Sequence, residues 1–268
     1  MEAIAVPPTP YRALPGFVDI LRSELCKLRT VRSTYWTLFA AVVFNVVLAA
    51  LLAIFIPGHL SAHDKATFDS TRVSLGGIHL SQIAFGVLGV LVITSEYTTG
   101  MIRATVSAVP RRRLMLAAKV IVFTVTALVV GIVSSFVAYF VFQAFLSDQS
   151  LRSSISDPGV ARALIGGGLF LTVLGLLGLG LGAIIRASAG SIAAVFGLLF
   201  VPQILVQLLP ASWKATIGPY VPMQAGSSIF SVRPETDALG PWAGFGVFCL
   251  YAAIALGVAF LLINRRDA

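Results

Sequence analysis

Charged residues are scarce in this sequence of 268 amino acids, and their scarcity excludes most soluble classes of protein. Lysine, arginine, aspartate and glutamate together make up 11% of the chain, whereas 57% of it is hydrophobic. Soluble domains carry roughly 25% charged residues. So high an apolar content also excludes general disorder. The chain is therefore predicted to be an integral membrane protein.

Cysteine is nearly absent, and so is any signal-peptide pattern. Cys26 lies in a basic amino-terminal segment and Cys249 lies in an apolar stretch, so neither a disulfide framework nor a zinc site has enough ligands in one place. The first 34 residues are mixed polar and carry prolines at positions 7, 8, 10 and 15. A signal peptide would have an early apolar region instead, so we expect none to be cleaved here.

Long uncharged stretches are what the sequence does contain. A helix needs about 20 residues to cross about 30 Å of hydrocarbon, whereas a β-barrel strand would be about 10 residues long and alternate in polarity. Six stretches are long enough for a helix: Tyr35–Ile56, Gly76–Ser95, Leu114–Leu146, Val160–Ile185, Gly190–Leu209 and Pro241–Ile263. We expect an all-α membrane protein, with residues 35–268 forming a domain of six transmembrane helices.

The net charge of +8 falls on one side of this predicted bundle. If the amino terminus is inside, 13 of the 19 basic and 5 of the 11 acidic residues lie on the cytoplasmic side, which leaves six of each outside. Cytoplasmic loops carry an excess of Lys and Arg. We therefore expect both termini in the cytoplasm, and nucleic acid is not needed as a partner to explain the basic excess.

The segment Phe17–Val31 is amphipathic at the helical period, with its apolar residues on one arc and its basic residues on the other. Such a helix lies in the membrane interface, with its basic face toward lipid phosphates. Residues 1–34 are thus expected to be a cytoplasmic tail and an interfacial helix. Two charged residues, Glu24 and Arg32, break the pattern because they fall within the apolar arc. The alternative is a juxtamembrane anchor with no further role.

The inner loop from Glu96 to Arg113 is basic yet carries apolar residues. The rule for cytoplasmic loops explains its arginines, but it does not explain Met101, Ile102, Val106 and Val109. Exposed apolar patches usually have a partner. Thr98 or Thr99 is suited to cap a short helix that Pro110 ends, which would form a docking surface for a cytoplasmic partner.

The fourth apolar stretch is rich in glycine. Gly178 and Gly182 form a G-x-x-x-G pair, which lets helices approach closely in lipid. The residues from Gly178 to Ala183 also match a dinucleotide fingerprint. No strand precedes that match and no acidic residue follows it at about 20 positions, so helix packing is favoured.

Several residues inside the spans are candidates for a substrate pathway. Polar residues within a membrane usually face the interior of a bundle, and interhelical hydrogen bonding is the alternative. The polar candidates are Asn45, Gln143, Gln203 and Gln207. Aromatic residues are candidates for an apolar route, with simple packing as the alternative: Phe44, Phe85 and Phe196.

His59 and His63 are four residues apart and Asp64 lies beside them, a spacing that suits two metal ligands on a helix. They follow Pro57 and Gly58, where a regular helix is not assured. We favour a solvated loop and expect no metal site.

The inner loop and its flanks resemble the signature of type-2 ABC export permeases. In that family an acidic residue ends the second span, a glycine begins a coupling helix and a P-x-x-R…K stretch leads into the third span. The matching residues here are Glu96, Gly100, Pro110, Arg113 and Lys119. The stretch before the first span is similar to the family's connecting helix, through Glu24, Lys27 and Arg29. Pro219-Tyr220-x-Pro222 resembles an outer-loop pattern of actinobacterial members.

The resemblance implies the membrane subunit of an ATP-driven exporter in a bacterial plasma membrane. Two such subunits, identical or not, would form the pathway, and two cytoplasmic ATPase subunits would supply the energy with their own ATP and magnesium. The chain contains no G-x-x-x-x-G-K-S/T phosphate loop, so it is not expected to be an enzyme or to hold a cofactor. Its substrate would be apolar or amphipathic, such as a drug, an antibiotic, a lipid or a peptide.

By the same resemblance, Gly100–Ala108 would be the coupling helix, which inserts into a groove of the ATPase. Its contact residues would include Met101, Ile102, Arg103 and Thr105. Glu96 would hold the entry to this helix through an ion pair with a basic neighbour such as Lys119 or Arg32, because an unpaired buried carboxylate is costly.

The outer loop 210–240 holds aromatic residues between prolines. With the resemblance, this pattern predicts short re-entrant helices that form an outer gate, and an interfacial aromatic belt is the alternative. The gate candidates are Trp213, Pro219, Tyr220 and Pro222.

Other functional classes fit less well. A membrane enzyme is disfavoured because the chain has no H-E-x-x-H, no G-x-S-x-G and no paired acidic residues within its spans. A secondary transporter usually shows inverted repeats and buried ionisable residues, and neither is visible. A membrane scaffold without an ATPase stays open as an alternative.

Overall fold

The computed structural model describes residues 16–59, 61, 65, 68–101, 112–232 and 238–265, and within these ranges every regular element is helical. Six helices are long and apolar enough to cross a membrane, which confirms the predicted all-α class and the number of spans. The long helices are α1 (Phe17–Thr30), α2 (Arg32–Phe55), α5 (Ile78–Thr98), α7 (Arg112–Phe145), α8 (Val160–Ile185), α9 (Ser188–Gln207) and α12 (Pro241–Arg265).

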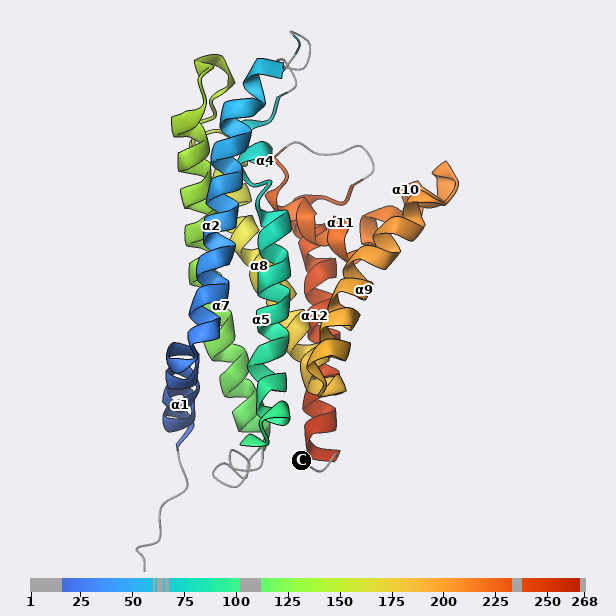
Figure 1. The fold of residues 1–268 in the computed structure, drawn as a ribbon. Coiled ribbons are helices and arrows are strands. Elements are labelled where there is room, and N and C mark those ends of the chain that lie inside the picture. Colours follow the sequence, from blue (N-terminus) through green and yellow to red (C-terminus); the bar gives the residue numbers. More distant parts are fainter. Residues whose placement is uncertain are drawn as a thin grey trace, which may run out of the picture.

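Short helices connect the long ones at the end of the bundle away from α1 (Figure 1). These are η1 (Pro57–His59), α4 (Ser70–Ser74), η2 (Gln149–Leu151), α10 (Ala211–Ile217), η3 (Gly218–Tyr220), α11 (Pro222–Ser227) and η4 (Ser228–Phe230). Helix α1 and the carboxyl end of α12 lie together at the opposite end (Figure 1). An even number of spans places α1 and the carboxyl end of α12 at the same end of the bundle in this way.

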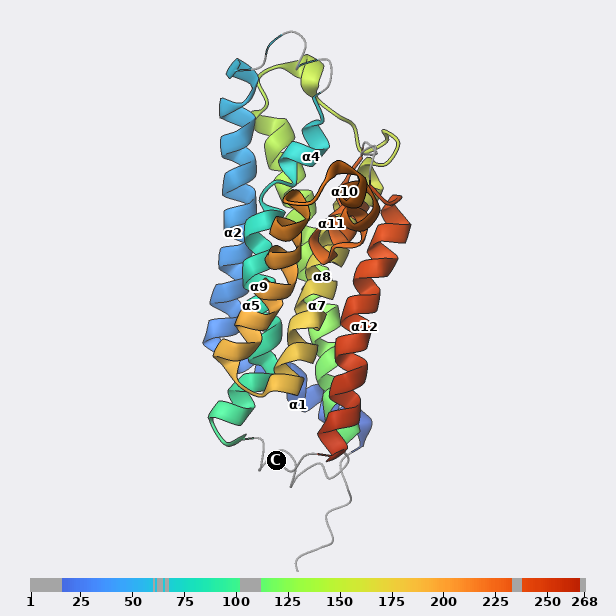
Figure 2. The ribbon, with the colours of Figure 1, turned by 90° about the vertical axis from the view of Figure 1, so that its right-hand side faces the viewer.

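Helix α8 is the centre of the bundle, with most of its residues buried against α5, α7 and α12. Helix α2 packs on α7 and α5, and Figure 2 shows α2 and α12 on opposite sides of this centre. Helix α9 crosses α8 and α5 and tilts outward toward α10 (Figure 1). Helix α7 has 34 residues and, at about 1.5 Å per residue, it is longer than a bilayer's hydrocarbon core of about 30 Å.

Glycines of α8 let the neighbouring helices approach closely. A Cβ added to Gly178 would lie 2.6 Å from the carbonyl oxygen of Gly86 on α5, and one added to Gly168 would lie 2.6 Å from the backbone nitrogen of Ile132 on α7. A Cβ on Gly180 would lie 2.9 Å from Ala255 of α12. Real Cβ atoms do not tolerate such distances, so the predicted role of the glycine-rich stretch in helix packing is confirmed.

The short helices before α12 are held to the core by one arginine and a group of aromatic rings. The guanidinium of Arg162 donates to the carbonyl oxygens of Ile229 at 2.8 Å and Ser231 at 3.0 Å. The ring of Phe170 on α8 contacts Phe230 and Phe248, with centroids 5.4 and 5.3 Å apart. These contacts anchor η4 between α8 and α12.

Candidate functional site

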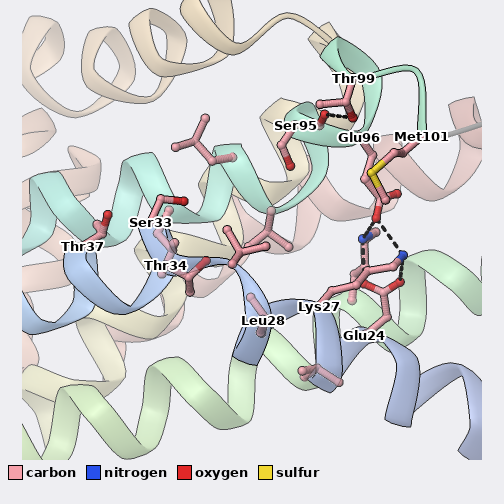
Figure 3. Close-up of a pocket in the computed structure, with 16 residues that line it drawn as sticks. Glu24, Lys27, Leu28, Ser33, Thr34, Thr37, Ser95, Glu96, Thr99 and Met101 are labelled. Atoms are coloured by element: carbon pink, nitrogen blue, oxygen red, sulfur yellow. Dashed lines mark hydrogen bonds and ion pairs between the residues drawn. The ribbon is translucent and has the colours of Figure 1, made fainter.

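Four charged side chains meet where α1, α5 and α7 come together. The ammonium nitrogen of Lys119 lies 2.6 Å from Glu96 Oε1 and 2.7 Å from Glu24 Oε2. The ammonium nitrogen of Lys27 lies 2.7 Å from Glu24 Oε1 and 2.9 Å from Glu96 Oε1. Glu24, Lys27, Glu96 and Lys119 thus form a closed ring of alternating charge, called here the four-charge cluster (Figure 3).

The four-charge cluster is largely removed from water. Only 2% of Lys119, 4% of Glu24 and 5% of Glu96 is exposed, whereas the Lys27 side chain is 32% exposed. Buried charges of this kind need partners with good geometry. Two carboxylates and two ammonium groups make the cluster neutral, so it meets that need without an external ion.

The pKa of Lys27 is raised above its usual value. Partial burial by itself lowers this pKa, but hydrogen bonds and charge attraction from Glu24 and Glu96 together outweigh the burial. Lys27 therefore keeps its charge across the physiological range and holds the two carboxylates together.

The position of Glu24 explains the irregularity in the sequence of α1. Ile20 and Glu24 are one turn apart and are the two buried residues of this helix, so the carboxylate points into the bundle where an apolar residue would otherwise lie. Arg32, the other exception, is exposed at the start of α2. Of the two predicted partners of Glu96, Lys119 makes the ion pair.

Helix α5 extends to Thr98, three residues beyond the predicted end of this span at Ser95, and so includes Glu96. The hydroxyl groups of Thr98 and Thr99 both donate to the carbonyl oxygen of Ser95, at 3.0 and 2.7 Å, and close the last turn. A charged residue is accommodated within the span because its charge is paired.

Gly100 adopts a left-handed backbone conformation with φ of 71° and directly follows this helix end. A Cβ at this position would meet no atom within 4 Å, so the backbone angle, and not lack of space, favours glycine. Among the predicted coupling residues, Ile102, Arg103, Thr105 and Pro110 lie outside the described residues. Arg113 is exposed on the first turn of α7.

A second contact ties the same end of α5 to the turn between α8 and α9. The guanidinium carbon of Arg186 lies 5.2 Å from the ring centroid of Tyr97, and the hydroxyl of Ser188 donates to Thr94 Oγ1 at 2.8 Å. Arg186 has φ of 63°, the one positive φ among the described residues other than glycine. Sequence analysis missed this contact, because no local pattern links residues about 90 positions apart.

A cavity of about 420 Å³ opens beside the four-charge cluster, between α1, α2 and α5. Its walls are mostly apolar, with hydroxyl groups from α2 and the end of α5 (Figure 3). Glu24, Lys27, Glu96 and Lys119 all line one part of it. The site therefore combines an apolar chamber with paired charges.

The predicted pathway residues are spread over four helices, α2, α5, α7 and α9. The amide nitrogen of Asn45 donates to Ser134 Oγ at 2.9 Å, which links α2 to α7, and Phe85 is buried in the core. Phe44 lines a second cavity between α2 and α5, and Phe196 stacks on Phe200 of the same helix. Their roles in transport stay predictions.

Gln143 and the α9 glutamines make contacts of their own. The amide nitrogen of Gln143 donates to Ser153 Oγ at 2.8 Å. Gln203 is half-buried, and the side-chain oxygen of Gln207 accepts from Lys214 Nζ at 2.8 Å. The hydrogen bonds of Gln143 and Gln207 agree with the alternative to a pathway role, in which polar residues link segments of the chain.

The outer-gate candidates fall in the short helices before α12. Trp213 on α10 and Tyr220 at the end of η3 are exposed, whereas Pro219 and Pro222 are buried. His63 and Asp64 lie outside the described residues, and within the described ranges no group of three potential metal ligands is found.

Six helices able to span a membrane, with a buried and neutral charge cluster at one end of them, define a polytopic membrane protein. Residues 20–201 match the family described as ABC-2 family transporter protein. This match covers more than half of the chain, from α1 into α9, and the chain therefore belongs to that family. A comparison with curated proteins finds no match.

Family membership makes the chain a multi-pass membrane permease of the ABC type and a transport subunit rather than an enzyme. It also implies partnership with an ABC ATPase. The four-charge cluster and the whole α5–α7 connection fall within the matched range.

Proposed function

We propose that this chain is the membrane-spanning subunit of an ATP-driven exporter and that the segment Gly100–Ala108 docks on the partner ATPase. ATP and magnesium would be bound by that partner. Both termini would lie in the cytoplasm of a bacterium, with the net positive charge on that side.

The four-charge cluster is the observation that carries this proposal. Glu96 lies four residues before Gly100, and Lys119 lies seven residues after Arg112, the first residue of α7. Both helices that flank segment 102–111 are therefore held to each other and to α1. A force applied to that segment by an ATPase would move α5 and α7 as one unit, because two ion pairs would otherwise have to break in a buried setting.

The substrate is proposed to be an apolar or amphipathic compound, such as a drug, an antibiotic, a lipid or a peptide, that moves outward. A second permease copy or a paralogue would complete the pathway, with two ATPase subunits per complex. The exposed apolar faces of α2 and α9 support contact with lipid or with such a copy.

Purification of the full chain in mild detergent, with identification of any ABC ATPase that co-purifies with it, tests the proposal. We expect a stable complex in mild detergent, with ATP hydrolysis that candidate substrates stimulate. Arg103→Glu and Thr105→Pro should abolish this stimulation while the protein still inserts into the membrane.

Arg152→Glu is the matched control, because it reverses an exposed charge directly after η2, at the end of the bundle away from α1. It should leave the stimulation unchanged. Unaltered coupling in both the Arg103 and the Thr105 variants would contradict the docking role, and failure to recover any ATPase would favour a scaffold or a secondary transporter.

A further inference from the structure

The cavity beside the four-charge cluster has a polar end that the cluster leaves incomplete. Oε1 of Glu96 accepts from both Lys27 and Lys119, but Oε2 is buried and has no hydrogen-bond partner within the described part of the chain. Only 5% of Glu96 is exposed, and this residue lines the cavity. A buried carboxylate oxygen in this state costs free energy unless a donor reaches it.

A donor is also available in the same place. An ammonium group has three N–H donors, and Lys27 uses two of them on Glu24 and Glu96. Its side chain is 32% exposed and lines the cavity. The polar end therefore offers one acceptor at Glu96 and one donor at Lys27, within a cluster whose net charge is zero.

The rest of the cavity suits a hydrocarbon chain. Its volume of about 420 Å³ lies within the range of small-molecule pockets, roughly 300–1,000 Å³. Leucine and valine side chains from α1, α5 and α7 contribute to its largely apolar wall, among them Leu28, Leu88, Leu91, Val92 and Val122. It lies beside α1, the amphipathic helix expected in the membrane interface.

We propose that this cavity binds one phospholipid whose head group carries both a phosphate and a primary ammonium, as phosphatidylethanolamine does. The ammonium donates to Glu96 Oε2, the phosphate accepts from Lys27, and an acyl chain fills the apolar part. A zwitterionic head matches a neutral cluster, whereas a head with net charge would unbalance it. This lipid holds α1 against α5 and is a structural ligand, so the proposal does not depend on ATPase coupling.

Lipid competition on the purified full chain tests this site. The protein is placed in bilayers that contain equal amounts of phosphatidylethanolamine and phosphatidylcholine with matched acyl chains, and the lipid retained after gentle extraction is measured by native mass spectrometry. The choline head has no N–H donor, so it cannot satisfy Glu96 Oε2. We expect one retained lipid per chain and a preference for the ethanolamine head on the order of tenfold, which corresponds to one charge-assisted hydrogen bond.

A variant that fills the cavity separates this site from lipid bound elsewhere on the surface. Thr37 lines the cavity on α2, so Thr37→Trp should remove the retained lipid without altering the four-charge cluster. Val43→Trp adds similar bulk to an exposed position of the same helix and should retain the lipid as the native chain does.

Equal retention of the two lipids, or a preference for an anionic phosphatidylglycerol added as a third competitor, would overturn the proposal. So would retention of phosphatidylethanolamine that Thr37→Trp leaves unchanged. The head-group comparison on the native chain decides the matter even if Thr37→Trp fails to fold.

Discussion

Lys119 Nζ lies 2.6 Å from Glu96 Oε1, and only 2% of Lys119 is exposed. This contact joins α5 to α7 across 23 residues of sequence, and the chain between the two helices includes the segment proposed to meet the ATPase. Because Glu24 bonds the same ammonium group at 2.7 Å, α1 is part of the same unit.

Lys119→Met is expected to destabilise the protein strongly. It leaves Glu96 and Glu24 buried with one cation fewer, and removal of one partner from a buried ion pair costs about 3–5 kcal/mol. Lys27→Met is the matched comparison, since Lys27 bonds the same two carboxylates but is 32% exposed. Lys27→Met should lower the midpoint of thermal unfolding in detergent by a clearly smaller amount than Lys119→Met does. Equal shifts of the midpoint for both variants would show that the burial of each lysine does not determine its contribution to stability.

Gly178→Ala is expected to loosen the contact between α8 and α5. The added methyl would lie 2.6 Å from the carbonyl oxygen of Gly86, and overpacking of this kind costs about 1–3 kcal/mol. Gly246→Ala on α12 serves as the control, because its Cβ would meet nothing within 4 Å. Thermal unfolding of both variants checks this. A Gly178 variant as stable as the control would mean that the two helices separate without cost.

Gly100→Ala is expected to destabilise the end of α5 for a different reason. The space around Gly100 is open, but its φ of 71° costs a residue with a side chain roughly 1–2 kcal/mol. Gly197→Ala is a suitable control, since that site is also open and lies within α9 without a positive φ. Asparagine tolerates this backbone region better than alanine, so Gly100→Asn should unfold at a temperature between those of Gly100→Ala and the native chain. The opposite order would rule out backbone strain as the cause.

The ion pair between Lys65 and Asp148 predicts a small effect of pH. Hydrogen bonds from Lys65 and Ser150 lower the pKa of Asp148 from 3.8 to about 2. A carboxyl group whose pKa is lower in the folded state stabilises the fold above the unfolded pKa and loses this contribution as pH falls. The stability difference between the native chain and Asp148→Asn should therefore be constant above about pH 5 and be lost progressively between about pH 5 and pH 1. It should also shrink in high salt, because the pair is exposed. A difference that persists undiminished at about pH 1 would assign the effect to packing.

The sequence predicted the six spans to within a few residues at most ends, because uncharged stretches of this length have no other favourable environment. The second span was the informative exception. The predicted stretch ended at Ser95 because the next residue, Glu96, is charged. Helix α5 continues to Thr98, with Lys119 and Lys27 neutralising that carboxylate. The irregular position of Glu24 in the apolar arc of α1 carried the same information, but it could be interpreted only after its partners were known.

Local pattern was enough to predict a membrane protein with six helices able to span the bilayer, because both follow from hydropathy along the chain. The one-sided positive charge stays a prediction. Only the tertiary structure decided which cation Glu96 meets. Arg32 and Lys119 are both basic and both near the same end of the bundle, but the packing of α5 against α7 brings Lys119 within 2.6 Å, whereas Arg32 is exposed. The cation–π contact between Arg186 and Tyr97 and the unpartnered oxygen of Glu96 arise in the same way, from helices that meet in space and are distant in sequence.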